Sequence, residues 1–296
     1  MTHDQFLYLR KRGGDEMELQ ETFDRFLADM KLEGKADMTL VEYANRLSRF
    51  QNYLIRHKKQ LTEVNHDDIL EFTREMFKKS LSSATVKCEL STLYVYTLWA
   101  VKNGIISHVP LSPADYPKTN TAKKRIRRLS NENIRAFIAY IDSLQENIRA
   151  AFWLMYGTGA RVGEIAHLMA TDVQLRERAV YINIRDAKWG SDRCVPIIDK
   201  QAAKIVWQYQ QSVGPSKQPL FRVSRRTLQW YATKFAQETG IKFHCHLLRH
   251  TFAARLTEKG VPITTIQYLL GHRTVAMTAY YAQSALVDMT SITPTI

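Results

Sequence analysis

The sequence contains few cysteines and no long hydrophobic run. Its three cysteines lie far apart, at Cys88, Cys194 and Cys245, so they predict neither a disulfide framework nor a cysteine-based zinc site. The strongest apolar run, residues 150–156, is too short to span a bilayer. The first twelve residues lack the apolar core of a secretory signal. We therefore expect a protein of the reducing cytoplasm, neither secreted nor embedded in a membrane.

The signatures of nucleotide and metal chemistry are missing as well. There is no Walker phosphate loop, no GxGxxG after a strand and no HExxH. No cluster of carboxylates resembles a two-metal nuclease site. A hydrolase that uses magnesium on phosphates is therefore not indicated.

Positive charge is what the sequence has in excess. The chain of 296 residues holds 42 Lys+Arg against 29 Asp+Glu, which gives a net charge of +13. Residues 1–110 carry 16 residues of each sign, so the whole excess lies in residues 111–296. A basic protein most often meets nucleic acid, and less often an anionic membrane or an acidic partner. The charge therefore favours a nucleic-acid partner for the second part of the chain.

The first part of the chain is predicted to be a helical domain. Apolar residues recur at helical spacing in four stretches of residues 18–106, which predicts a four-helix domain after an N-terminal extension, residues 1–17. The segment from Thr39 to Glu42 matches a capping box, which predicts a helix start there.

A basic linker is predicted to follow, over residues 107–128, because prolines and small polar residues precede a run of like charges. The charged residues of this run are Lys123, Lys124, Arg125, Arg127 and Arg128. The run is either a solvated hinge or a hinge that lies along a polyanion.

The remaining residues, 129–296, are predicted to form a mainly α-helical domain with a small antiparallel β-sheet. Ser130 is a candidate N-cap for the first helix. Residues 180–185 alternate as a strand does, residues 194–198 form a candidate partner strand, and residues 186–192 would connect them as a hairpin loop.

Several side chains of this domain could do chemistry, although each has an ordinary structural alternative. His246, Arg249 and His250 would share one helix face, where an arginine could grip phosphate oxygens and a histidine could pass a proton. The alternative is a histidine satisfied in a helix interface beside a surface arginine. Arg161 precedes a helix, a favourable place for a phosphate, and Glu164 could orient a basic neighbour. The alternative is a surface salt pair.

The hairpin loop and the C-terminal segment add further candidates. Lys188 at the loop tip could reach an oxygen that rigid helices cannot, or it could face solvent. His272 follows Gly271, which would cap a helix, and precedes Tyr280 and Tyr281. A tyrosine hydroxyl can attack phosphorus, whereas a buried aromatic pair is the alternative.

Together and in this order, these residues resemble one family. The stretches GTGARVGEI, HLLRHTFA and LLGHRTVAMTAYY are similar in sequence and spacing to the tyrosine recombinases, also called the phage integrase family. The resemblance is specific over residues 129–290, and for residues 18–106 it is one of architecture, that of a core-binding domain. In this family the nucleophile falls nine residues after the histidine of the Gly-His pair, which implies Tyr281 as the nucleophile and Tyr280 as a structural residue.

The resemblance implies the central steps of the chemistry. Arg161 and Arg249 would hold the non-bridging oxygens of the scissile phosphate. Tyr281 would attack in line and leave a 3′-phosphotyrosine and a free 5′-hydroxyl.

It also implies roles for the remaining candidates. Lys188 would protonate the leaving 5′-oxygen, His246 would assist proton movement at the tyrosine, and His272 would hydrogen-bond the phosphate. Glu164 would support the site, and neither a metal nor a cofactor would be needed. The family usually has Gly-Lys-Gly in the hairpin, whereas here Ala187 and Trp189 flank the lysine.

The resemblance finally implies a biological setting. A two-domain recombinase of the Xer-like or transposon-encoded type would act on double-stranded DNA with inverted half-sites, in integration, excision or resolution. It would work as a homotetramer on paired sites, or as a heterotetramer with a related recombinase, in a bacterial cytoplasm in association with the nucleoid. The alternatives are a type IB topoisomerase-like enzyme that relaxes supercoils and a DNA-binding regulator without catalysis.

Overall fold

A computed structural model of the chain describes residues 19–118, 128–185, 191–214 and 216–279. The chain forms two units that divide between Lys123 and Lys124, and each unit has a hydrophobic core of its own. Most of these residues are helical, and the strands form one small antiparallel sheet in the second unit. The predicted fold class is therefore confirmed. No helix within these ranges is both long enough and apolar enough to cross a membrane.

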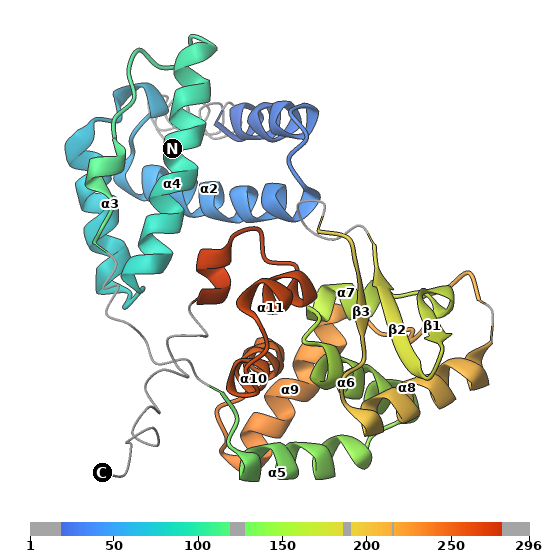
Figure 1. Cartoon of the computed structure of the whole chain (residues 1–296). Coiled ribbons are helices and arrows are strands. Elements are labelled where there is room, and N and C mark those ends of the chain that lie inside the picture. The colour runs from blue at the N-terminus through green and yellow to red at the C-terminus, as the bar shows by residue number, and fades with distance from the viewer. Residues whose placement is uncertain (1–18, 119–127, 186–190, 215, 280–296) are drawn as a thin grey trace, which may run out of the picture. The chain divides into compact units, whose positions relative to one another are not determined.

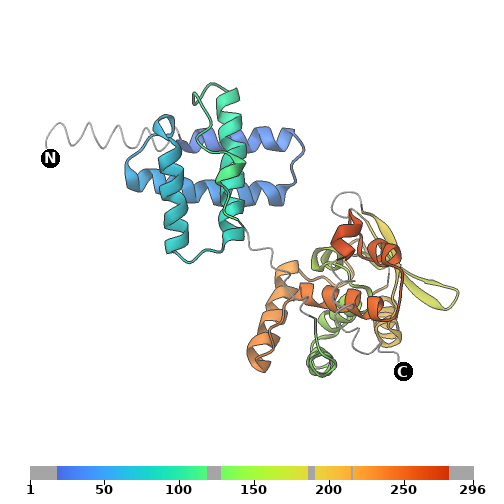
Figure 2. The ribbon, with the colours of Figure 1, turned by 60° about the vertical axis from the view of Figure 1, so that its left-hand side comes forward.

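The described part of the first unit contains four α-helices and two short 3-10 helices. They are residues 19–32, α2 (Asp37–His57), η1 (Leu61–Glu63), α3 (His66–Lys78), α4 (Ser83–Lys102) and η2 (Pro113–Asp115). Figures 1 and 2 show the helix of residues 19–32 beside α2, with α3 and α4 crossing this pair. The four helical stretches expected from the sequence thus correspond to four helices.

Helix starts in this unit follow local capping rules, with one correction to the sequence analysis. Asn65 caps α3: its side chain accepts from the backbone N–H of Asp68 at 3.2 Å, and the Asp68 carboxylate accepts from the backbone N–H of Asn65 at 3.0 Å. The predicted helix start at Thr39 is wrong, because α2 begins at Asp37. The carboxylate of Asp37 lies in the first turn, where the positive end of the helix dipole favours it.

Aromatic side chains pack against one another in the core of the first unit. Phe26 packs edge-on against Tyr96, with ring centroids 5.3 Å apart, and Phe50 packs in the same manner against Phe72 at 5.2 Å. Leu111 also belongs to this core, although it lies in the segment expected to be a linker. The packing of the first unit therefore extends beyond residue 106.

The described part of the second unit is a helical body with a three-stranded sheet at its side (Figure 1). Its helices are α5 (Asn131–Asp142), α6 (Glu146–Thr158), α7 (Val162–His167), η3 (Ala170–Asp172), α8 (Lys200–Val213), α9 (Arg225–Thr239), α10 (Cys245–Glu258) and α11 (Ile263–Leu270). The middle of α6 is buried on all sides, and α6 packs against both α8 and α10. Ser130 caps α5 as predicted, accepting from the backbone N–H of Asn133 at 3.1 Å.

The sheet has the order β1-β2-β3 and is antiparallel throughout. Its strands are β1 (Val173–Arg176), β2 (Ala179–Ile184) and β3 (Arg193–Pro196). Ile182 lies opposite Val173 on one side and Val195 on the other, and all three side chains are buried. The sequence analysis expected β2 and β3 but not β1, which pairs with β2 in a hairpin that projects from the unit (Figure 2).

Candidate active site

The chain brings the ends of several elements together at the end of α11. The link from α6 to α7 turns at Gly159, which has a φ of 64°. A Cβ at this position would lie 2.6 Å from the ring of Phe252, so only glycine allows α6 and α10 to approach this closely. This turn places Arg161, the N-cap residue of α7, next to the C-terminal end of α11.

Arg161 is held by contacts on two sides and stays partly open to solvent. Its Nη1 donates to Oε1 of Glu164 at 2.8 Å, and its Nη2 donates to the carbonyl of Gly271 at 3.2 Å. Its backbone N–H also donates to Oε2 of Glu164 at 2.7 Å. The side chain is 25% exposed, so the guanidinium is oriented by the protein and accessible to a ligand.

Arg249 lies deeper and joins two helix ends. Its Nη1 donates to the carbonyl of Gly159 at 3.0 Å, and its Nη2 donates to the carbonyl of Leu270 at 2.6 Å. The residue is only 1% exposed, whereas the sequence analysis left a surface arginine open as an alternative. Because Leu270 and Gly271 are adjacent, the guanidinium groups of Arg249 and Arg161 lie side by side at the end of α11.

Two histidines stand beside this pair of arginines. His246 lies in the first turn of α10, with its ring 4.6 Å from the ring of His250. The surrounding protein removes water from the His246 ring, and His250 and Arg249 add positive charge, which lowers the pKa of His246 to about 4. The ring is therefore neutral at pH 7.

His272 directly follows Gly271 and is buried. Its Nδ1 lies 2.8 Å from Oγ1 of Thr278. Burial, reinforced by the charges of Arg249 and Arg161, lowers the pKa of His272 to about 3. A neutral imidazole at this position can form hydrogen bonds without adding charge to the site.

Glu164 and Arg193 complete the described part of the site. Burial alone would raise the pKa of Glu164, but hydrogen bonds and charges from Arg193 and Arg161 outweigh this effect and hold the pKa below its usual value. The sequence analysis missed Arg193. Its signal was the alternation of β3, which places residue 193 on the same buried face as Val195.

The remaining sequence candidates fall largely outside the described residues. Lys188, Tyr280 and Tyr281 lie there, as do four members of the basic run: Lys123, Lys124, Arg125 and Arg127. Arg128, the fifth member, is described and forms an ion pair with Glu258 at the end of α10. In the described ranges, no three His, Cys, Asp or Glu side chains are grouped closely enough to hold a metal ion.

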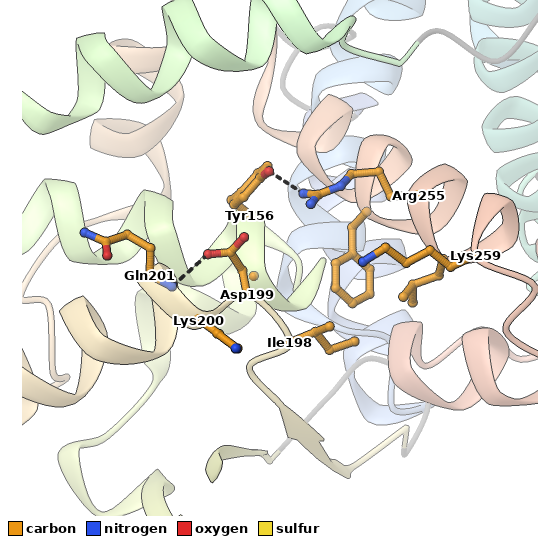
Figure 3. Close-up of a pocket in the computed structure, with 10 residues that line it drawn as sticks. Tyr156, Ile198, Asp199, Lys200, Gln201, Arg255 and Lys259 are labelled. Atoms are coloured by element: carbon orange, nitrogen blue, oxygen red, sulfur yellow. Dashed lines mark hydrogen bonds between the residues drawn. The ribbon is translucent and has the colours of Figure 1, made fainter. Parts of the chain in front are cut away.

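A separate pocket of about 390 Å³ lies between α6, α8 and α10 (Figure 3). Figure 3 shows the guanidinium of Arg255 directed at the hydroxyl of Tyr156, to which it donates a hydrogen bond. The carboxylate of Asp199 accepts a hydrogen bond from the backbone N–H of Gln201 at 3.0 Å. Burial raises the pKa of the Tyr156 hydroxyl.

The arrangement at the end of α11 suits a phosphate. Among the described residues of the site, Arg161 and Arg193 pair with Glu164, whereas Arg249 donates to backbone carbonyls. Three guanidinium groups and one carboxylate leave an excess of positive charge. Guanidinium forks match the paired oxygens of a phosphate, and two neutral imidazoles are at hand to exchange protons or hydrogen bonds. The site can therefore bind a phosphodiester and stabilise added negative charge on it.

Comparison with known proteins agrees with a site that binds a phosphodiester. The sequence matches the phage integrase family over residues 127–286, more than half of the chain, and the N-terminal SAM-like domain of phage integrases over residues 23–104. Tyrosine recombinase XerA of Thermococcus kodakarensis is 27% identical over 277 residues, with 90% of this chain and 92% of that protein covered. Tyrosine recombinase XerC of Roseiflexus sp. is 29% identical over 280 residues, with 88% and 87% covered.

Solved structures share the fold. A lambda integrase dimer bound to a COC′ core site superposes with a TM-score of 0.71 at 20% identity and covers 90% of this chain and 77% of that one. The XerH recombinase bound to a palindromic difH substrate gives a TM-score of 0.69 at 21% identity, with 86% and 80% covered. The match over residues 127–286 shows that the chain belongs to the phage integrase family.

Proposed function

We propose that the chain is a site-specific DNA recombinase that cuts and rejoins duplex DNA through a 3′-phosphotyrosine. The observation that carries the proposal is the pair of arginines, Arg161 and Arg249, held side by side at the end of α11 and next to His272. Relatives that align with most of the chain are named tyrosine recombinases, which favours recombination over supercoil relaxation and over a regulator without catalysis.

The first step is attack on the scissile phosphate. The hydroxyl oxygen of Tyr281 forms a bond to phosphorus, and the bond from phosphorus to the 5′-oxygen breaks. Arg161 and Arg249 stabilise the negative charge that gathers on the non-bridging oxygens, because both guanidinium groups are oriented before the substrate arrives. His272 donates a hydrogen bond to the same phosphate from a neutral ring.

Protons move at both ends of the reacting bond. His246, whose ring is neutral at pH 7 because its pKa is lowered to about 4, assists the movement of the tyrosine proton. Lys188 gives a proton to the departing 5′-oxygen, which becomes a hydroxyl. Glu164 supports Arg161 through two hydrogen bonds. The phosphotyrosine conserves the energy of the broken bond, so a 5′-hydroxyl from another strand can attack it and restore a phosphodiester.

The partner in this proposal is double-stranded DNA with inverted half-sites. Supporting structures include a lambda integrase tetramer bound to a Holliday junction, and the excess charge of +13 in residues 111–296 suits a polyanion. We propose a tetramer on paired sites, built from copies of this chain or shared with a related recombinase, with the basic run Lys123–Arg128 along the DNA. The enzyme would act on the DNA of the nucleoid, in the cytoplasm.

The decisive test is Tyr281→Phe, with Tyr280→Phe as the matched control. Protein is incubated with a nicked target site, in which cleavage releases a short fragment that diffuses away and so leaves the covalent adduct trapped. The adducts are then resolved under denaturing conditions. We expect the wild type and Tyr280→Phe to form the adduct, and Tyr281→Phe to bind DNA but form none. An adduct that survives Tyr281→Phe and disappears in Tyr280→Phe would overturn the assignment of the nucleophile. Cleavage without strand exchange between two duplexes would favour the topoisomerase-like alternative.

A further inference from the structure

We propose that Arg193 is a positioning residue of this site, which fixes Glu164 and, through Glu164, the phosphate-binding Arg161 against the end of α11. The role of Arg193 in catalysis rests on the proposed function, whereas its position is given by its own contacts. Arg193 lies on β3, between the motif stretches GTGARVGEI and HLLRHTFA and outside both.

Arg193 is buried and its hydrogen-bonding groups are engaged in several directions. Its side chain is 2% exposed. The Nε donates to the carbonyl of Leu269 at 2.9 Å, and Nη1 donates to the carbonyl of Ser191 at 3.2 Å. Nη1 and Nη2 donate to Oε1 and Oε2 of Glu164 at 3.2 Å and 3.0 Å. A buried guanidinium held this completely has a fixed position and fixes its partners in turn.

Glu164 is shared between two arginines. The same carboxylate that accepts the two-nitrogen fork of Arg193 also accepts the backbone N–H and the Nη1 of Arg161. With its two oxygens fixed by Arg193, Glu164 presents a rigid acceptor to Arg161. Without Arg193, the described hydrogen bonds of the Glu164 carboxylate would be those with Arg161 itself, so Glu164 could no longer orient that guanidinium from a fixed position.

The shared carboxylate also has a consequence for charge. Glu164 paired with Arg161 alone would cancel the positive charge of that guanidinium. Arg193 supplies a second cation to the same carboxylate, so the group of three keeps a positive excess beside the accessible Arg161. Since Arg161 is the more exposed of the two arginines, this excess is available to a phosphate.

One helix end sets the relative positions of three arginines. Leu269, Leu270 and Gly271 are consecutive, and their carbonyls accept from Arg193, Arg249 and Arg161 in that order.

Carbonyls at a helix C-terminus have no partner within the helix and carry partial negative charge. The end of α11 therefore acts as a common acceptor for all three guanidinium groups. Arg193 is the one that also orients Glu164 by a two-nitrogen fork.

The test is a double-mutant comparison of strand cleavage in single-turnover reactions with saturating protein on a nicked site. Arg193→Met should slow adduct formation about 10- to 100-fold, the usual cost of losing a residue that orients a site residue, while DNA affinity stays within about threefold. In an Arg161→Ala background, Arg193→Met should add little further loss, because its effect passes through Arg161.

Two control variants separate positioning from folding and from charge. Arg149→Met removes a partly exposed ion pair with Asp142, bound at 2.8 Å in the same unit, and should leave cleavage unchanged in both backgrounds. Arg193→Lys keeps the charge but not the fork, and should recover only a small part of the loss. All rates are measured well below the melting temperature of each variant.

Two results would overturn the proposal. One is a loss in Arg193→Met that multiplies in full in the Arg161→Ala background, and the other is full recovery in Arg193→Lys. A further measurement needs no DNA: relaxation of the Nε–H signal of Arg161 should show a more mobile guanidinium in Arg193→Met and not in Arg149→Met. An unchanged Arg161 signal contradicts the positioning of Arg161 even without cleavage activity. A wild-type protein that forms no adduct contradicts the proposed function instead.

Discussion

The described parts of the two units differ in their buried charges: the first buries carboxylates, whereas the second also buries arginines. In the first unit, Glu89 is only 2% exposed, whereas its partner Arg49, bound at 2.6 Å, is 52% exposed. In the second unit two arginines are buried: Arg193 pairs with Glu164, whose side chain is buried as well, and Arg249 donates to backbone carbonyls. When a buried carboxylate pairs with a cation at the surface, the two charges neutralise each other. A buried excess of cations leaves a positive potential for an incoming anion. The second pattern is the one that suits an anionic ligand.

The largest expected effect is on the rate of adduct formation, when an arginine is removed from the second unit and, for comparison, one from the first. Arg249→Ala should slow adduct formation about 100- to 1000-fold, because it removes a donor that stabilises the transition-state charge. DNA affinity should remain within about threefold, since many other phosphate contacts persist. Arg56→Met in the first unit breaks the pair with Glu75, and should cost at most about 1 kcal/mol of stability without slowing cleavage of saturated DNA.

Measuring cleavage, affinity and melting temperature for both variants decides whether the comparison holds. Equal losses of binding and cleavage in Arg249→Ala would assign that residue to general DNA affinity. A slowed cleavage step in Arg56→Met would show that the first unit contributes to the chemistry as well.

Acid should act on the second unit before the first. His272 has a folded pKa of about 3, below its ordinary value of 6.5. As the pH falls below 6.5, the unfolded chain binds a proton at this ring and the folded unit does not. The stability that neutral His272 allows is therefore complete above pH 6.5 and falls by about 1.4 kcal/mol per pH unit until the pH approaches 3.

The first unit should respond at lower pH. The hydrogen bond from Arg56 lowers the pKa of Glu75 to about 2, from 4.5, so the contribution of Glu75 is complete above 4.5 and is lost between 4.5 and 2. Residue-resolved hydrogen exchange, corrected for the intrinsic pH dependence, should show the second unit losing protection first. His272→Gln should reduce this difference, and protection that is lost first in the first unit would contradict it.

The smallest expected effect is none. If side-chain cations of the second unit supply the positive charge at the phosphate, a chelator should leave the rate of adduct formation unchanged. The rate on a nicked site is measured with and without chelator at constant ionic strength, because salt alone weakens DNA binding. A rate that falls with chelator and returns with magnesium would mean that the arginines at the end of α11 are insufficient.

Local rules in the sequence reached much of the fold and part of the site. Ser130 marked the start of α5, Gly271 marked the end of α11, and the spacing from Arg161 to Glu164 indicated their contact. These features depend on neighbours within one turn of a helix. Such interactions are determined by short stretches of sequence and can be recognised there.

Features that depend on distant segments were missed. Strand β1 is a short strand that exists because β2 pairs with it. The depth of Arg249 depends on carbonyls of Gly159 and Leu270, far away in the chain. An arginine is usually exposed, so the sequence alone does not predict that Arg193 is buried. Its burial can be understood only when its partners, Glu164 and the end of α11, are known.

The glycine at the end of α11 has a further consequence for how the protein can change. Gly271 has a φ of 63°, and a Cβ there would lie 2.7 Å from Nη1 of Arg193. Even a methyl group would therefore collide with a side chain that sits 78 positions earlier in the sequence. A side chain at position 271 would therefore have to adopt a left-handed backbone conformation and also displace Arg193, so the glycine and the arginine depend on each other.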